Sequence, residues 1–266
     1  YASLPIGRFR QHIAATLTES DGYRHNTDFK FANIFYQAQW TALRGQWDFL
    51  INHNQRAFGA NGFYGNLSFT EQYEEVQTDA ASLGYRFQSG NFTLKPRVYW
   101  RRNQDMYVFL REKPDVFRNF HLSQFLGGEI NSTLKSTWGT TGVGLSFDRT
   151  DLFSNRLGQR SREAANVFVE HRFEWMNGRL DVTPGIAGSQ FSDFGGFVFP
   201  GLDAGFQIND TWKIFANTGL TSRIPTYTDL YYEDAGNKGN PNLKPERAFA
   251  NELGAKWFKK GINAQI

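Results

Sequence analysis

Cysteine is absent from the 266 residues, which excludes disulfide bonds, thiolate nucleophiles and cysteine-ligated metal sites. No apolar run approaches the roughly 20 residues that a membrane-spanning helix needs. The chain also has no large excess of charge of either sign. The 29 basic residues face 26 acidic ones, and the net charge of +3 provides no basic field for nucleic acid. Because G-x-S-x-G, P-loop and H-E-x-x-H motifs are missing too, we expect neither an enzyme nor a nucleic-acid-binding protein.

Aromatic residues, by contrast, are abundant. They make up 17% of the chain, with 26 Phe, although the mean hydropathy is −0.53. A chain that is aromatic-rich yet hydrophilic on average must separate the two kinds of residue locally. In residues 92–100 and 167–175 the separation has a period of two, with apolar side chains alternating with Lys, Arg or Glu. Since strand side chains alternate between faces and no segment keeps a 3.6-residue period, the sequence predicts an all-β fold.

The expected connections between strands alternate in length along the whole chain. Short turns rich in Gly, Asn and Asp are expected at residues 44–45, 88–91, 138–139, 176–178, 209–210 and 259–261. Longer connections are expected at residues 19–26, 58–73, 105–123, 150–163, 192–196 and 222–247. An antiparallel meander with short turns at one end and long loops at the other is typical of bacterial outer-membrane barrels, whose short turns face the periplasm.

A soluble β-sandwich would show the same alternation of side chains. Several expected strands, however, extend over about 10–14 residues, which is nearer to a tilted bilayer span than to the norm of soluble strands. Aromatics expected near strand ends would form interfacial girdles, namely Tyr85, Phe87, Trp100, Trp138, Trp175 and Trp212. We therefore predict an antiparallel transmembrane β-barrel. About thirteen strands are expected, an odd number that leaves the barrel incomplete.

Residues 221–254 read TSRIPTYTDLYYEDAGNKGNPNLKPERAFANELG and contain two motifs at a fixed spacing. The first has the form R-x-P-T-x-x-D-L-Y and the second G-N-P-N-L-K-P-E. Together, and followed by E-L-G, they resemble the signature of TonB-dependent receptors. The matching residues are Arg223, Pro225, Thr226, Asp229, Leu230, Tyr231, Gly239, Asn240, Pro241, Asn242, Leu243, Lys244, Pro245 and Glu246, with Glu252, Leu253 and Gly254 after them.

Segments 22–28, 58–64, 94–100 and 168–173 resemble the cobalamin-receptor-like branch of this family found in Bacteroidota. The resemblance implies a location in the outer membrane of a Gram-negative bacterium, with membrane lipid as a partner. It also implies roughly 22 strands closed around an N-terminal plug that contacts TonB. Residues 1–266 would then be a partial barrel that lacks the plug and the final strands. Its role would be to import a scarce small nutrient, a cobalamin or related corrinoid. The alternatives are a ferric siderophore receptor, a passive porin and a soluble β-protein with a lectin-like face.

Two loops are candidates for contact with a ligand. In the signature, Pro225, Pro241 and Pro245 remove backbone donors and fix φ, so we expect a stiff, folded loop whose role is mainly structural. The loop after residue 54 offers a possible substrate-contacting set, Phe58, Asn61, Phe63 and Tyr64. Its aromatics could stack on a planar or corrinoid ligand, or pack the loop against its neighbours.

Metal and cofactor sites are not expected. The five His residues are scattered, and none pairs at a spacing typical of metal ligands. The resemblance implies that a haem receptor of this family would carry a His between the two motifs, and residues 224–240 contain none, which argues against haem. Asp203, Asp229, Glu233 and Asp234 could hold calcium, since this ion prefers oxygen ligands, but solvated loop charge is the favoured interpretation.

Overall fold

A computed structural model of the chain describes residues 1–63, 66–234, 236–259 and 262–266. Within these residues, fourteen strands form one antiparallel sheet in which each strand pairs with its neighbours in sequence. The elements are β1 (Ala2–Ile6), β2 (Phe9–Ser20), β3 (Phe29–Ala42), β4 (Gly45–Gly59), β5 (Tyr73–Ser89), β6 (Phe92–Val108), β7 (Arg118–Ser136), β8 (Gly139–Ser154), β9 (Gly158–Trp175), β10 (Leu180–Phe191), β11 (Gly195–Gln207), β12 (Trp212–Arg223), α1 (Tyr227–Tyr231), β13 (Glu246–Lys259) and β14 (Ile262–Gln265).

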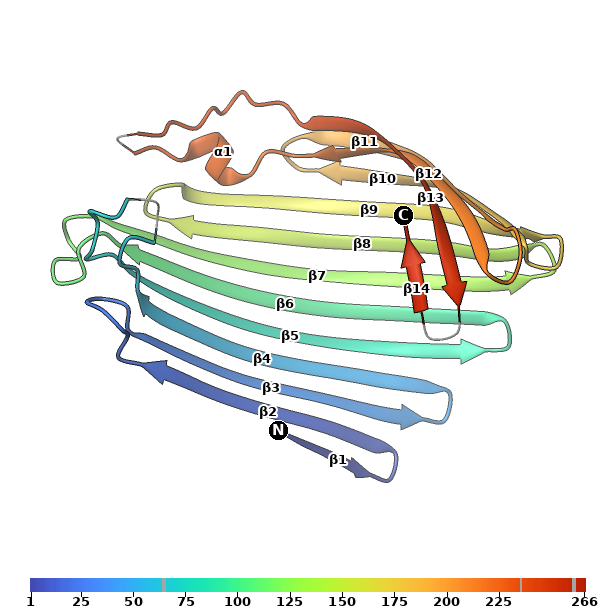
Figure 1. Cartoon of the computed structure of the whole chain (residues 1–266), viewed down its shortest axis with the longest axis horizontal. Coiled ribbons are helices and arrows are strands. Elements are labelled where there is room, and N and C mark those ends of the chain that lie inside the picture. The colour runs from blue at the N-terminus through green and yellow to red at the C-terminus, as the bar shows by residue number, and fades with distance from the viewer. Residues whose placement is uncertain (64–65, 235, 260–261) are drawn as a thin grey trace.

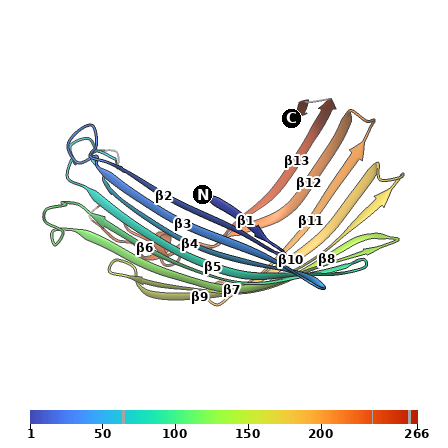
Figure 2. The ribbon, with the colours of Figure 1, turned by 90° about the horizontal axis from the view of Figure 1, so that it is seen from below.

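The sheet is curved into an open trough, as Figure 2 shows. Its order runs from β1 to β14, and the sheet is not closed within the described residues. The predicted all-β class and the incomplete antiparallel barrel are therefore confirmed. The count of about thirteen strands was one too low because the hairpin of β1 and β2 was missed. Its turn consists of Gly7, which has a φ of 59°, and Arg8, and contains no Asn or Asp.

Long and short connections alternate up to β8, and Figure 1 shows the long loops at one end of the sheet and short turns at the other. After β8, only the connection at residues 224–245 is long. Three of the expected long loops are shorter than predicted, occupying residues 109–117, 155–157 and 192–194 instead of 105–123, 150–163 and 192–196. In the second of these regions, charged residues pair within the strands. Arg149 contacts Asp151 at 2.9 Å and Glu163 on the next strand at 3.2 Å. Such pairs let polar sequence continue as strand.

The two faces of the sheet differ in chemistry. Leu145 and Phe147 lie in register with Val167 and Ala165, and we call this side the apolar face. Ser146 lies opposite Asn166 on the other side, the polar face. Only eight apolar residues are buried among the described ones: Ala38, Ala60, Val108, Leu152, Leu157, Ala164, Phe197 and Leu230. The apolar face thus stays open, with Leu145 56% exposed. A surface of this kind requires an apolar medium.

Aromatic side chains gather on the apolar face near the short turns. Trp40 pairs with Trp47 in register, and Trp212 with Trp257. The ring of Trp47 lies 4.6 Å from that of Tyr85. Of the expected girdle residues, Trp100 lies inside β6 instead of at its end. The described residues include no helix that is long and apolar enough to cross a membrane.

Candidate functional site

The first residue of the signature and the last residue of its second motif form the final residue pair between β12 and β13. Arg223 and Glu246 face each other in register. The Arg223 guanidinium donates from Nη2 to Glu246 Oε1 at 2.9 Å and from Nε to Oε2 at 3.2 Å. Asp229 Oδ2 lies 3.9 Å from Arg223 Nη1. Two residues at opposite ends of the motif are thereby joined. The segment between them, residues 224–245, is called the signature loop below.

Helix α1 lies inside the signature loop and was not predicted. Thr226 is its N-cap, and the Thr226 hydroxyl accepts from the backbone N–H of Asp229 at 3.1 Å. The Asp229 carboxylate accepts in return from the backbone N–H of Thr226 at 2.9 Å. This capping box satisfies two amides that a helix start leaves unpaired. The same hydrogen bonds lower the pKa of Asp229, the backbone bond from Thr226 being the largest cause.

The second part of the signature folds back over α1. Gly239 donates to the Tyr232 carbonyl at 2.7 Å, and Asn240 donates to the Asp229 carbonyl at 2.9 Å. A Cβ on Gly239 would lie 2.7 Å from the backbone of Leu230, so only glycine allows this approach. Leu230 is 2% exposed beneath it. The loop is folded over itself, as the Pro and Asn residues predicted.

The Asn and Pro residues at the end of the signature shape the return to β13. Asn240 accepts at its side-chain Oδ1 from Asn242 N at 3.0 Å and at its carbonyl from Leu243 N at 3.2 Å. The other residues of this part are Pro241, Lys244 and Pro245, and all except the half-buried Pro245 are exposed. Their contact with a ligand stays a prediction.

The signature loop is docked on the polar face by residues far away in sequence. Arg162 of β9 donates to the Pro225 carbonyl at 3.2 Å, and its guanidinium lies 4.8 Å from the centre of the Tyr227 ring. Arg160 lies 3.7 Å from the Tyr231 ring centre. These contacts correspond to cation–π geometry. Burial raises the pKa of Tyr227, whose hydroxyl is buried without a hydrogen-bond partner among the described residues.

A second assembly joins three loops at the same end of the sheet. Asn26, which has a φ of 51°, is 9% exposed and donates from Nδ2 to the carbonyls of Thr70 at 2.8 Å and Gln72 at 2.6 Å. Its Oδ1 accepts from Arg111 Nη1 at 3.0 Å. Arg111 also binds both carboxylate oxygens of Asp28, at 2.6 and 2.9 Å. We call Asn26, Asp28 and Arg111 the loop clamp.

The ion pair of the loop clamp perturbs both partners. The hydrogen bond from Arg111 is the largest cause that holds the pKa of Asp28 below its usual value, and Asp28 in turn raises the pKa of Arg111. The Arg111 guanidinium also lies 4.5 Å from the Tyr73 ring centre. Sequence reasoning missed the clamp because Arg111 lies on a different loop from Asn26 and Asp28, and the carbonyls that Asn26 binds lie on a third. The isolated Asn of the segment 22–28 was the only local signal.

Beside the clamp, four Phe residues form a continuous aromatic cluster. Phe29 pairs with Phe58 in register, which puts Phe29, Phe31 and Phe58 on the polar face. Ring centroids lie 4.9 Å apart for Phe29 and Phe31, 6.5 Å for Phe31 and Phe58, and 5.8 Å for Phe58 and Phe63. Phe63 is 66% exposed. The aromatic cluster therefore packs the loop and still presents ring surface.

The predicted substrate-contacting set is thus divided by the structure. Phe58 and Phe63 lie together in the aromatic cluster. Asn61 instead joins loops: its Nδ2 donates to the His25 carbonyl at 2.6 Å, and its carbonyl accepts from Arg24 at 3.0 Å. Tyr64 lies outside the described residues. The contact of any of these residues with a substrate is untested.

The acidic residues considered for calcium are dispersed. No group of three or more His, Asp or Glu residues with metal-site geometry occurs in the described part of the chain. Asp234 Oδ1 accepts from the backbone N–H groups of Gly236 at 2.8 Å and Asn237 at 2.7 Å. Glu233 lies 3.8 Å from Lys238, and Asp203 pairs with Asn217 in β12. Calcium in these loops stays an untested prediction.

Comparison with known sequences decides the family. The profile of the TonB dependent receptor-like β-barrel matches residues 13–266. The chain belongs to this family. It is 25% identical over 133 residues to the vitamin B12 transporter BtuB of Vibrio vulnificus (strain CMCP6), a match that covers 47% of the chain and 20% of the relative. It is 40% identical over 52 residues to BtuB of Photobacterium profundum, covering 20% of the chain and 8% of the relative.

Solved structures of low sequence identity share the fold. The siderophore receptor PirA of Pseudomonas aeruginosa is 15% identical, with a TM-score of 0.78 over 99% of the chain and 49% of PirA. The Serratia marcescens hemophore receptor HasR, solved as a double mutant with its hemophore HasA and heme, is 13% identical, with a TM-score of 0.79 over 98% of the chain and 48% of HasR. The chain therefore spans about half the length of these receptors, and a fifth or less of the curated relatives.

Family membership places this TonB-dependent receptor chain in the outer membrane, as the sequence predicted. It also agrees with the expectation that the chain is not an enzyme. The alternation of short turns and long loops then has a direction, because short turns of outer-membrane barrels face the periplasm. The loop clamp, the aromatic cluster and the signature loop lie at the outer end.

Proposed function

We propose that the chain is part of the wall of a receptor that captures a scarce small nutrient at its outer loops and imports it. We propose a cobalamin or a related corrinoid as the substrate. The observation that carries this proposal is the aromatic cluster on the polar face beside the loop clamp. A large, partly apolar ligand is held by aromatic surface with a few polar groups around it.

The relatives add support for the substrate class. The curated sequences to which the chain is similar are vitamin B12 transporters of Vibrio and Photobacterium. In this proposal the loop clamp keeps three loops in place around the cluster, so that little conformational entropy is lost when the ligand binds. The signature loop covers part of the polar face and narrows the outer mouth.

The proposal includes partners and further parts of the protein. Residues 1–266 would be a partial barrel, and a plug preceding them and final strands following them would complete a barrel of roughly 22 strands. The plug would contact TonB, which supplies the energy for import. The apolar face would contact membrane lipid, since its exposed side chains need an apolar medium. No bound cofactor is part of the proposal.

A ferric siderophore is the second candidate substrate. Two lysines exposed at the outer loops, Lys113 and Lys244, would favour an anionic ferric chelate over a neutral ligand. The passive porin is a weaker alternative, because membership of a receptor family argues for specific ligand capture.

Titration of the full-length receptor with cyanocobalamin and with ferric siderophores tests the proposal. We expect tight binding of cyanocobalamin, and about tenfold weaker binding by Phe63→Ala, since an aromatic contact contributes about 0.5–1.5 kcal/mol beyond the area that it buries. Tyr23→Ala is the matched control, as Tyr23 is an exposed loop aromatic outside the cluster. Binding of a siderophore alone, or equal losses in the two variants, would reject the proposed site.

A further inference from the structure

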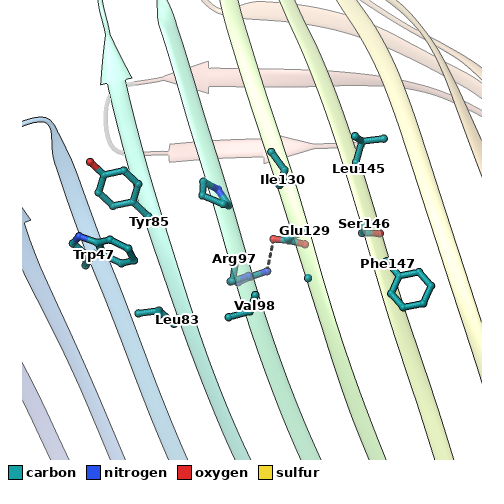
Figure 3. Close-up of a pocket in the computed structure, with 12 residues that line it drawn as sticks. Trp47, Leu83, Tyr85, Arg97, Val98, Glu129, Ile130, Leu145, Ser146 and Phe147 are labelled. Atoms are coloured by element: carbon teal, nitrogen blue, oxygen red, sulfur yellow. Dashed lines mark ion pairs between the residues drawn. The ribbon is translucent and has the colours of Figure 1, made fainter.

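The apolar face carries a groove that crosses β4 to β8, shown in Figure 3. It has a volume of about 610 Å³, and its walls are Leu83, Val98, Ile130, Leu145 and Phe147, with Trp47 and Tyr85 at one end. Arg97 and Glu129 alternate with these residues along β6 and β7, so their side chains lie on the polar face, where they pair with each other at 2.9 Å. The walls are therefore apolar.

The floor of the groove depends on Gly128. This residue lies opposite Val98 on β6 and Phe147 on β8, and the missing side chain leaves the depression between them. A Cβ at Gly128 would meet its nearest atoms at 3.7 Å, which is ordinary contact. Its neighbour Gly127 differs, because a Cβ there would lie 2.5 Å from Tyr99 on the polar face. A side chain at position 127 would displace the Tyr99 ring, whereas one at position 128 would meet no such close contact.

The groove lies in the half of the wall that is nearer to the short turns. Trp47 closely follows the turn at residues 43–44, and Tyr85 closely precedes the turn at residues 90–91. Trp and Tyr side chains concentrate at the boundary between headgroups and hydrocarbon. The end of the groove at Trp47 and Tyr85 therefore marks the periplasmic boundary, and the part at Phe147 extends into the hydrocarbon.

The short turns at this end of the first ten strands carry charges of one sign. The short turns between β1 and β10 contain Arg8, Arg44 and Arg179 and no acidic residue, and all of them are described. Arg44 immediately precedes β4, the strand that carries Trp47. Basic groups at a membrane boundary attract anionic lipid headgroups. An apolar groove with a cation at its boundary end fits a lipid better than a flat protein surface.

We propose that this groove binds one phospholipid of the periplasmic leaflet, with an acyl chain along Val98, Gly128 and Leu145 and an anionic headgroup beside Arg44. The inference rests on the outer-membrane location and is independent of the substrate. It differs from general contact between lipid and wall, because one site would hold a lipid longer than the rest of the apolar face does.

Native mass spectrometry of the full-length receptor, released from nanodiscs of phosphatidylglycerol and phosphatidylethanolamine, tests this site. We expect the receptor to retain phosphatidylglycerol, and Gly128→Leu, which fills the groove, to reduce retention several-fold. Gly188→Leu is the matched control. Gly188 also lies on the apolar face, outside the groove, and a Cβ there would meet its nearest atom at 3.6 Å. Equal retention by the two variants would overturn the proposal.

A second variant keeps the test decisive if Gly128→Leu fails to fold. Arg44→Gln changes only an exposed turn residue, and we expect it to lower the preference for phosphatidylglycerol over phosphatidylethanolamine several-fold. An unchanged preference would contradict the anionic headgroup. A receptor that leaves the nanodisc as a dimer, and becomes monomeric on Gly128→Leu, would show that a second copy occupies the groove and would also overturn the proposal.

Discussion

The loop clamp and the signature loop occupy the same end of the sheet, but they are held by contacts of different range. In the clamp, Arg111 binds residues more than 80 positions away, and Asn26 bridges to a third loop. In the signature loop, the capping box joins Thr226 and Asp229, which are only three positions apart. Only its docking through Arg160 and Arg162 is distant in sequence.

This difference predicts how the two assemblies respond to substitutions. The signature loop contains several independent local stabilisers, so the loss of one leaves the others in place. The clamp depends on one half-exposed ion pair and one buried amide that three loops share. Loss of the Asn26 amide would affect all three loops together. Variants in the clamp should therefore spread their effects, and variants in the signature loop should keep them local.

The largest effect is expected for Asn26→Ala. The substitution removes three side-chain hydrogen bonds, two to the carbonyls of Thr70 and Gln72 and one from Arg111. It also places an alanine at a φ of 51°. We expect local destabilisation by about 2–3 kcal/mol. Hydrogen exchange should then accelerate by roughly a hundredfold in residues 21–28, 66–72 and 109–117 together.

Two comparisons separate the causes. Asn26→Gly keeps the favourable φ but loses the hydrogen bonds, so we expect it to recover only a small part of the loss. Asn177→Ala places an alanine at a φ of 56° in a short turn, so it measures the effect of the backbone conformation alone. The clamp as described is wrong if exchange accelerates in residues 21–28 only.

A smaller effect is expected from acid. Arg111 lowers the pKa of Asp28 in the folded protein, so the stabilisation is present above the ordinary pKa of 3.8 and is lost as the pH falls through the lowered value. Pepsin cleavage of the three loops should therefore increase below about pH 4. Asp28→Asn should weaken the clamp by about 1 kcal/mol at neutral pH, since solvent screens this pair, and should flatten the pH dependence.

Glu71 provides the control for the acid experiment. Its pKa is also lowered, mainly by the Thr70 hydroxyl and then by His25. In Glu71→Gln the pH dependence that belongs to Asp28 should remain. If Asp28→Asn and wild type show the same profile of cleavage against pH, another group causes the acid response.

The strands were predictable because a period of two appears directly in the sequence, as in residues 167–175 of β9. The motif residues were also visible, but α1 was not, since five residues are too few to show a helical period. The T-x-x-D spacing of Thr226 and Asp229 was the available signal. The clamp could not be predicted, because Asn26 meets Arg111 only when the sheet brings the β2–β3 and β6–β7 loops together at one end of the strands.

Within the signature loop, Thr226→Ala should have a moderate and local effect. The substitution removes the N-cap of α1 and should cost about 1 kcal/mol. Hydrogen exchange should accelerate in residues 227–234 and leave the loop clamp unchanged. Thr228→Ala is the matched control, because Thr228 is an exposed residue in the first turn whose side chain does not form the capping box. An equal effect of the two variants would mean that the box does not stabilise α1.

The smallest effect is expected from removing the ion pair at the two ends of the signature loop. Arg223 and Glu246 form a two-point ion pair, but their side chains are 61% and 69% exposed, so water and salt screen the attraction. A double-mutant cycle of Arg223→Gln and Glu246→Gln should give a coupling weaker than the effect of Thr226→Ala and sensitive to ionic strength. Strong coupling that persists in high salt would instead mean that the full-length protein buries this pair, since only the removal of water would strengthen it so much. The measurement thus tests whether the outer mouth of this hairpin is open in the complete receptor.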